Sequence, residues 1–198
     1  MIKANNLSKS FNGNRIFSGI NINLEKSKVL GVVGNNGSGK TTLLKIVAGI
    51  INSDTGEINL NENIKLDFLG HENMLYQNFS ISENIDFFSN ISGFRISSES
   101  QNEIEKALGL KNISGKKISE LSYGQRKKAS MLRSLMSDPE LLILDEPFSN
   151  LDSDSTDSFI SILKTLKESG KSIIISSNRK DIVGSVSDNL LNMDDYNE

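Results

Sequence analysis

The sequence predicts an α/β protein built around a mainly parallel sheet. Apolar runs of strand length alternate with amphipathic helical segments, and this alternation favours parallel strands joined by helices. A glycine-rich segment, residues 34–41, lies between an expected strand and an expected helix. A second apolar run, residues 141–145, ends in carboxylates. Because a helical stretch over about 80–136 interrupts the alternation, we expect a sheet core with a helical insert.

The composition favours one ordinary domain, 1–198. The chain has 198 residues, of which 36% are hydrophobic and 24% charged, enough for a substantial core. The net charge of −3 gives no overall basic surface, so we expect no nucleic-acid partner. The lack of cysteine excludes a disulfide framework. No targeting segment is evident, and the apolar runs fall short of the roughly 18 residues of a spanning helix, so we expect another chain to cross any membrane.

The first expected elements are a hairpin, a core strand and a helix. Residues 1–24 hold two strand-like segments around Asn12-Gly13, a dipeptide that accepts the positive φ of a tight turn. Residues 28–33 are apolar and end in glycines, as a short buried strand does. Helical spacing of leucine, valine and isoleucine predicts a helix over 40–50. Two further strands are expected at 57–60 and 64–70.

The insert and the C-terminal part follow. Ser80 stands three residues before Glu83, which is the pattern of a capped helix start. A second helix is expected to end at Gly109. The remaining expected elements are a helix at 122–136, a strand at 141–145, a helix at 153–168, a strand at 172–176, a short helix and a strand at 189–193.

Residues 34–41, GNNGSGKT, match the phosphate-loop pattern G-x-x-x-x-G-K-[ST]. Glycines let the backbone turn its N–H groups inward, Lys40 reaches the β- and γ-phosphates, and the Thr41 hydroxyl helps to hold Mg²⁺. The alternative is an ordinary glycine-rich turn, but the position between strand and helix favours nucleotide binding. The candidate binding residues are Gly34, Asn35, Asn36, Gly37, Ser38, Gly39, Lys40, Thr41 and Thr42.

The strand at 141–145 ends in Asp145, and Glu146 follows it. In this position Asp145 faces a metal ion, and Glu146 polarises a water for attack on the γ-phosphorus. Alone, the pattern also fits a strand that ends in an acidic helix cap. Together with the phosphate loop it favours ATP hydrolysis.

The segment LSYGQ, residues 121–125, opens a helix and offers backbone N–H groups to an anion. Alone it fits many helix starts. In chain order, GNNGSGKTT, LSYGQ, LLILDEP and SNLD resemble the ATP-binding-cassette (ABC) ATPases over essentially the whole chain. The resemblance implies a P-loop NTPase fold, with a RecA-like mainly parallel core (1–79 and 137–198), an N-terminal antiparallel β subdomain and a helical insert (80–136).

The resemblance also implies ATP and Mg²⁺ as cofactors and a second copy of the chain as partner. In the family, the LSGGQ-type signature binds the γ-phosphate of the ATP held by the other subunit, so two copies close face to face over two nucleotides. Phe11 matches the aromatic residue that stacks on adenine. Asp152 lies in the loop 149–152 that acts across the dimer. The signature positions here are Leu121, Ser122, Tyr123, Gly124 and Gln125.

Two positions depart from the family pattern. Glu72 stands where the family has a glutamine that reaches Mg²⁺ and the attacking water, and Asn178 stands where it has the switch histidine. We therefore expect Thr41, Asp145 and Glu72 at the metal, and Glu146 as base with Glu72 and Asn178 tuning a slow rate. The single histidine, His71, is expected to be incidental. The basic residues Arg126, Lys127, Lys128 and Arg133 are expected to form mostly a solvated helix face.

The function that the resemblance implies is an ATPase subunit that powers a polytopic membrane permease from the cytoplasmic side of the inner membrane, as a peripheral protein. The permease is expected to dock near 72–90. The segments RIFSGINI, LGHENMLYQNFSISENIDFF and DEPFSNLD look like the ATPase of the cytochrome c maturation haem exporter, which implies haem export. The alternatives are another small ABC exporter, a soluble ABC ATPase of DNA repair or translation, and a catalytically weak ATP-gated regulator.

Overall fold

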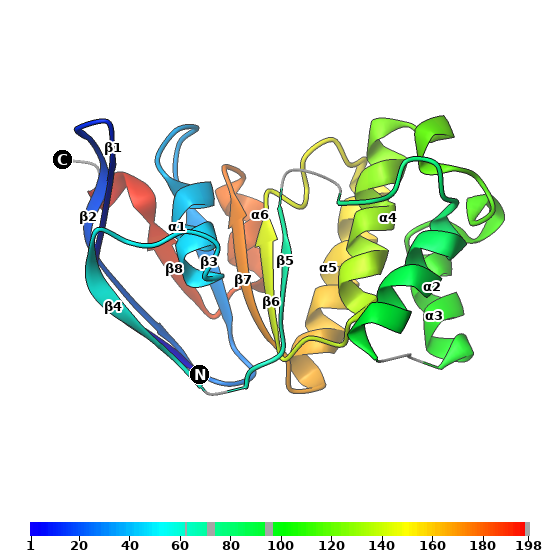
Figure 1. Ribbon diagram of the computed structural model, residues 1–198, viewed down its shortest axis with the longest axis horizontal. Coiled ribbons are helices and arrows are strands. Elements are labelled where there is room, and N and C mark those ends of the chain that lie inside the picture. Colours follow the sequence, from blue (N-terminus) through cyan, green and yellow to red (C-terminus); the bar gives the residue numbers. More distant parts are fainter. Residues whose placement is uncertain (62, 71–73, 94–96, 197–198) are drawn as a thin grey trace.

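The computed structural model describes residues 1–61, 63–70, 74–93 and 97–196. It shows the expected α/β architecture (Figure 1). The strands are β1 (Ile2–Phe11), β2 (Asn14–Leu24), β3 (Val29–Val33), β4 (Thr55–Leu60), β5 (Leu66–Leu69), β6 (Leu141–Asp145), β7 (Ser172–Ser177) and β8 (Asn189–Asn192). The helices are α1 (Lys40–Val47), α2 (Ile81–Ser92), α3 (Ser98–Ala107), α4 (Tyr123–Met136), α5 (Ser153–Glu168) and α6 (Lys180–Val186), with short 3₁₀ turns η1 (Lys111–Ile113), η2 (Ile118–Glu120) and η3 (Met193–Tyr196).

The strands form two sheets. An antiparallel sheet has the order β2-β1-β4, and a parallel sheet has the order β5-β6-β7-β3-β8. Asn12 (φ 51°) and Gly13 (φ 81°) make the hairpin turn between β1 and β2, as the sequence predicts. The predicted fold class is therefore confirmed.

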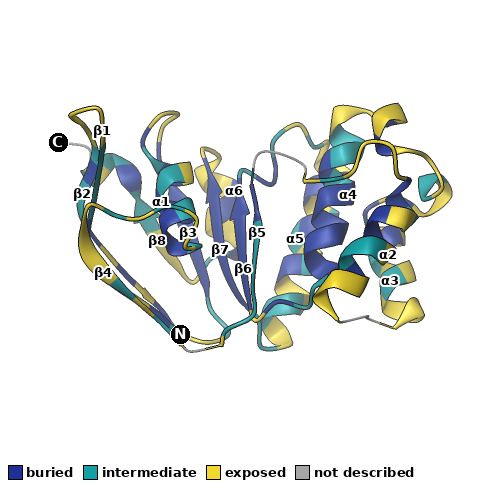
Figure 2. Cartoon of the chain, viewed as in Figure 1, coloured by how far each residue is buried: buried dark blue, intermediate teal, exposed yellow. Residues whose placement is uncertain are grey.

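Two hydrophobic cores lie on the two faces of the parallel sheet. Successive strand residues point to opposite faces, so Ile174 joins the core with α1 and the antiparallel sheet, whereas Ile173 and Ile175 join the core with α4 and α5. Buried residues accordingly line both sides of the sheet, while solvent reaches the outer surfaces of the helices (Figure 2). A sheet covered on both faces holds the carboxyl ends of its strands in fixed positions.

Helices α2, α3 and α4 lie together at the end of the molecule remote from the antiparallel sheet (Figure 1). The Ser80 side chain accepts from the Glu83 N–H at 3.2 Å, and the Glu83 carboxylate accepts from the Ser80 N–H at 2.7 Å. The predicted capping of α2 is thus confirmed. None of the helices in the described part of the chain has the length and apolar character needed to cross a membrane.

Two expectations about helices are wrong. The helix predicted over 40–50 ends at Val47, because Gly49 takes a positive φ of 72° and terminates it. The basic residues after the signature do not share a solvated face: Lys127 is 0% exposed and Arg133 is 8% exposed. The reason is that α4 packs against both α2 and β5, and Arg133 there pairs with Asp67 of β5 at 3.0 Å.

Candidate nucleotide-binding site

The glycine-rich loop lies between β3 and α1, at the carboxyl end of the parallel sheet (Figure 1). Gly34, Gly37 and Gly39 all have positive φ, of 151°, 84° and 88°. A Cβ on Gly39 would lie 2.7 Å from Ile16 Cγ2 of β2, so a side chain there would collide with the hairpin. The backbone can therefore wrap closely and present its N–H groups at the start of α1.

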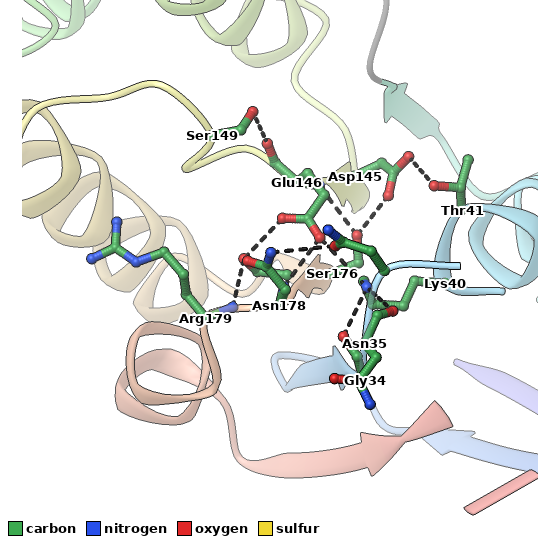
Figure 3. A network of polar contacts seen from close by, with 12 residues as sticks. Gly34, Asn35, Lys40, Thr41, Asp145, Glu146, Ser149, Ser176, Asn178 and Arg179 are labelled. Atoms are coloured by element: carbon green, nitrogen blue, oxygen red, sulfur yellow. Dashed lines mark hydrogen bonds and ion pairs between the residues drawn. The ribbon is translucent and has the colours of Figure 1, made fainter. Parts of the chain in front are cut away.

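Lys40 points into this loop (Figure 3). Its Nζ donates to the carbonyls of Gly34 and Asn35, each at 2.9 Å, and lies 3.6 Å from Glu146 Oε1. The ammonium is buried and has a full set of nearby acceptors in this arrangement. It stands where it can exchange those partners for the oxygens of a phosphate.

Asp145 ends β6 beside Thr41 of α1. Thr41 Oγ1 donates to Asp145 Oδ2 at 2.8 Å, and Ser176 Oγ donates to Asp145 Oδ1 at 2.6 Å. A hydroxyl and a carboxylate side by side are the hard oxygen donors that Mg²⁺ prefers, and Mg²⁺ takes few protein ligands when phosphate is present. Within the described residues no three histidine, aspartate or glutamate side chains cluster as a complete metal site. The Thr41 hydroxyl and the Asp145 carboxylate fit a metal ion whose other ligands come from a nucleotide and water.

Glu146 follows in a left-handed backbone conformation, with φ of 47°. Ser177 Oγ donates to its Oε2 at 2.9 Å, and the Asn178 N–H donates to its Oε1 at 3.1 Å. Its own N–H donates to the Ser176 carbonyl at 3.1 Å. A positive φ is rare for a residue with a side chain, and here it turns the carboxylate toward the phosphate loop (Figure 3).

Asn178 lies beside both Glu146 and the loop. Besides the backbone contact, its Nδ2 donates to Asn36 Oδ1 at 3.3 Å, so the structure brings this predicted site residue to the phosphate loop. Glu72 and His71 lie outside the described residues.

The signature residues begin α4. Ser122 Oγ accepts from the Gln125 N–H at 3.3 Å, and Gln125 Oε1 accepts from the Ser122 N–H at 3.0 Å. Together they form a capping box, which leaves the α4 N-terminus ordered. Leu121 is buried beneath it, whereas Tyr123 is exposed. Because α4 and α1 lie on opposite faces of the parallel sheet, the signature belongs to a different surface from the phosphate loop of the same chain (Figure 1).

The start of α4 touches the loop 149–152. A Cβ on Gly124 would lie 3.3 Å from the Asn150 carbonyl, and Lys128 pairs with Asp152 at 3.8 Å. Asp152 caps α5 by accepting from the Ser155 N–H through Oδ1 at 2.8 Å. Hydrogen bonding from the Ser155 hydroxyl, and after it from the Ser155 N–H, lowers the pKa of Asp152. Asp152 is therefore held between the signature helix and α5.

Phe11 is the exposed last residue of β1, and Lys9 Nζ lies 5.3 Å from its ring centroid. The hairpin end that carries Phe11 is on the same side of the molecule as the phosphate loop (Figure 1). The ring is thus exposed, with Lys9 over it, on the side of the molecule that carries the phosphate loop, where a base could stack on it.

Sequence reasoning missed three residues of this site. Ser176 and Ser177 bind the two carboxylates, and Asp194 of η3 accepts from the Asn35 N–H and Nδ2, both at 3.0 Å. The pair of serines at the end of an apolar run was visible as SIIISS, and parallel neighbouring strands would place them beside Asp145. Nothing local in the sequence marks Asp194.

The comparisons with known proteins agree with this geometry. A model of the ABC transporter family matches residues 17–149. An uncharacterised ABC transporter ATP-binding protein of Methanocaldococcus jannaschii is 34% identical, over 96% of this chain and 72% of that protein. A zinc import ATP-binding protein of Wolbachia pipientis is 34% identical, over 89% of this chain and 73% of that protein. A dimeric ATP-binding cassette, solved in a post-hydrolysis state with ADP and phosphate, superposes with a TM-score of 0.84 at 22% identity, over 97% of this chain and 94% of that one.

The chain therefore belongs to the ABC transporter family, as the ATP-binding and ATP-hydrolysing component of such a transporter. The structural likeness, at its low identity, shows the fold alone.

Proposed function

We propose that this ATPase works as a homodimer that closes over two Mg·ATP and drives a separate membrane permease, to which it binds peripherally on the cytoplasmic side. The observation that carries the proposal is the arrangement of Lys40, Thr41, Asp145 and Glu146 around the phosphate loop. These four side chains come from two segments of the chain, the start of α1 and the end of β6 with the residue after it. They supply a phosphate-binding cation, two metal donors and a base in one place.

In this site the phosphate loop binds and orients the triphosphate through its N–H groups and Lys40. Thr41 and Asp145 would hold Mg²⁺, which neutralises charge on the phosphate oxygens when bound. Glu146 accepts a proton from the attacking water, since its carboxylate is already directed at the loop by Ser177 and the Asn178 N–H. Water adds to the γ-phosphorus as the bond to the β-phosphate oxygen breaks, giving ADP and inorganic phosphate.

The second subunit supplies the other half of the site. The capped N-terminus of α4, with Ser122, Tyr123, Gly124 and Gln125, presents backbone N–H groups and the positive end of the helix dipole on a surface away from the chain's own loop. Two copies related by a two-fold axis would each place this tip on the partner's γ-phosphate. The dimeric form of a structural relative agrees with this arrangement.

The permease is proposed to dock on an aromatic cluster at the start of the insert. Tyr76 and Phe79 are exposed, and the Tyr76 ring packs 4.8 Å from Phe87 and 6.0 Å from Phe88. Met74 beside them is also exposed. An exposed aromatic and methionine patch is typical of a protein contact. We propose 80–136 as the part of a single domain that moves with the permease.

The transported substrate is a separate part of the proposal. The resemblance of three segments to the haem exporter ATPase supports haem export during cytochrome c biogenesis as one hypothesis. A relative reported above is a zinc import protein, so it gives this hypothesis no support. Another small ABC transporter remains the alternative, and the membrane subunit that co-purifies with the chain would decide between them.

The test of the ATPase proposal uses two variants. Lys40→Ala is expected to weaken ATP binding by about 10-fold or more, because a charge-assisted phosphate contact is lost. Glu146→Gln is expected to keep ATP affinity, lower kcat by about 10²–10⁴-fold and accumulate as an Mg·ATP dimer in size-exclusion chromatography. Lys106→Ala, an exposed change on α3, serves as the control. Unchanged ATP affinity in Lys40→Ala would refute the proposal.

A second candidate, a catalytically weak ATP-gated regulator, is favoured by one observation. Asn178 offers an amide in place of an imidazole and cannot transfer a proton. Dimerisation on ATP without phosphate release, in the presence of the membrane partner, would support this candidate over the transporter ATPase.

A further inference from the structure

Lys127 is a buried lysine whose ammonium makes no hydrogen bond to the part of the chain that the structure describes. It lies in the second turn of α4, its side chain is 0% exposed, and its Nζ has no hydrogen-bond partner among the described residues. A buried ammonium that donates no hydrogen bond is among the least favourable arrangements in a folded protein. Such arrangements persist chiefly where function maintains them.

The charges that act on Lys127 are those of the catalytic site. Burial lowers the pKa of Lys127, and the carboxylates of Asp145 and Glu146 oppose this by raising it. Both carboxylates already have hydrogen-bond donors, namely hydroxyls of Thr41, Ser176 and Ser177 and the Asn178 N–H. Lys127 therefore acts on them through its charge, which has a long reach in a buried, weakly polarisable interior.

The triphosphate site has an excess of negative charge that a further cation would offset. Asp145 and Glu146 place two negative charges next to the site of a triphosphate, and Lys40 Nζ lies 3.6 Å from Glu146 Oε1. Lys40 must turn to the phosphates when a nucleotide binds. The buried ammonium of Lys127 belongs to α4 and not to the phosphate loop, so its charge is not drawn to the nucleotide and still offsets the repulsion of the carboxylates for each other and for the phosphates.

Lys127 also links two functional parts of the molecule. It follows Tyr123 of the signature by one helical turn, and the same end of α4 touches the loop 149–152 through Gly124 and Lys128. Any displacement of α4 against the parallel sheet moves this charge relative to Asp145 and Glu146. The helix tip that serves one nucleotide is thus tied to the carboxylates that serve the other.

We propose that Lys127 is a positioning residue of the ATPase site: its buried charge keeps Asp145 and Glu146 arranged for hydrolysis and couples them to the signature helix. The proposal rests on the proposed function of this chain. A purely structural lysine would contribute to folding. A buried lysine retained for catalysis lowers the stability of the fold but raises the rate of hydrolysis. Replacing a structural lysine would therefore destabilise the protein, whereas replacing a catalytically useful one would slow hydrolysis without destabilising it.

The experiment replaces Lys127 by Met, which keeps length and removes charge, and by Arg, which keeps charge. In Lys127→Met we expect kcat for ATP hydrolysis to fall by about 10- to 100-fold while KM for ATP stays within about 2-fold. The thermal unfolding midpoint should stay equal or rise by up to about 4 °C, since a buried unpartnered charge is gone. Lys127→Arg should retain more activity than Lys127→Met. The control is Lys106→Met, on an exposed helix face, which should change neither quantity.

Two results would overturn the proposal. One is a Lys127→Met variant with kcat within about 2-fold of the wild type. The other is loss of activity accompanied by a lower unfolding midpoint, which would assign Lys127 a folding role. Direct ATP binding to the wild type and to Lys40→Ala is measured in parallel, so that a failure of the ATPase function itself is recognised separately.

Discussion

At the scale of single residues, two adjacent serines give two adjacent carboxylates different positions. Ser176 Oγ donates to Asp145 Oδ1 at 2.6 Å, whereas Ser177 Oγ donates to Glu146 Oε2 at 2.9 Å. Strands β6 and β7 are parallel neighbours that pair Asp145 with Ser176. The strand register therefore determines which carboxylate receives which hydroxyl.

The backbone and the side chain of Asn178 make separate contacts in the site. Its backbone N–H binds Glu146 whatever the side chain, while its side-chain amide reaches Asn36. Asn178→Ala should therefore keep Glu146 in place but remove a donor near the γ-phosphate, lowering ATP turnover by about 10- to 100-fold. Asn178→His should match or exceed the wild-type rate. Steady-state phosphate release measures both, and an alanine variant as fast as the wild type would show that the amide plays no part.

The phosphate loop and the pair Asp145–Glu146 could be predicted because each is specified by a few consecutive residues. Asp194 and Lys127 could not, since their roles depend on a contact between distant segments and on burial. Lys127 in particular sits in a run of basic residues, which by itself indicates a solvated surface. Only the packing of α4 shows that one member of that run is enclosed.

At the scale of elements, the insert begins with a cap that fixes its first helix. Ser80 and Glu83 exchange hydrogen bonds, and Asn84 Nδ2 donates to the carbonyls of Ser80 and Tyr76. The Ser80 N–H and carbonyl contacts belong to the backbone, so Ser80→Ala removes only the hydroxyl that accepts from Glu83. The cap thus orders the segment that carries the exposed aromatic cluster.

Ser80→Ala should lower the free energy of unfolding by about 1 kcal/mol, the usual cost of losing an N-cap. Urea denaturation followed by circular dichroism measures it. Ser161→Ala is the matched control, since this exposed hydroxyl only binds the Asp157 carbonyl within α5. We expect that control to change stability by less than about 0.5 kcal/mol. Equal effects from the two serines would contradict the capping argument.

The sequence specified the start and end of α5 but not the sheet to which each strand belongs. Helix α5 spans Ser153–Glu168 as expected, because Asp152 caps its start through the Ser155 N–H. Strand β4 pairs with β1 of the hairpin, and the sequence alone did not say which sheet this strand would join. Caps are local features, whereas pairing partners are chosen by the packing of distant segments.

At the scale of the whole molecule, Asp188 stabilises the parallel sheet at the amino ends of β3 and β8, the ends away from the nucleotide site. Its carboxylate accepts from the Val29 N–H at 2.8 Å, from Lys167 Nζ at 2.8 Å and from Lys28 Nζ at 3.3 Å. These groups belong to β3, the end of α5 and the residue before β3. One side chain therefore joins segments that are more than a hundred residues apart in sequence.

These contacts make Asp188 a source of pH-dependent stability. Burial by itself raises the pKa of Asp188, but the hydrogen bonds from Lys167, Val29 and Lys28 outweigh it and lower the pKa to about 2. Because the folded pKa lies below the unfolded value of 3.8, the stabilisation is fully present above about pH 4 to 5 and is lost as the pH falls toward 2.

Asp188→Asn should therefore cost about 1–2 kcal/mol at pH 7, a value kept modest because the side chain is 18% exposed and its lysine partners meet water. The difference between variant and wild type should shrink steadily in urea titrations at pH 4, 3 and 2, because protonation removes the same charge from the wild type. Glu57→Gln, on the exposed strand β4, should show no such convergence. If Asp188→Asn has a lower free energy of unfolding than the wild type by the same amount at every pH down to 2, the charge of Asp188 does not stabilise this end of the sheet. The stability of the sheet would then not depend on the ionisation of Asp188. Packing alone would hold the carboxyl ends of the strands, where the nucleotide site lies, in their fixed positions.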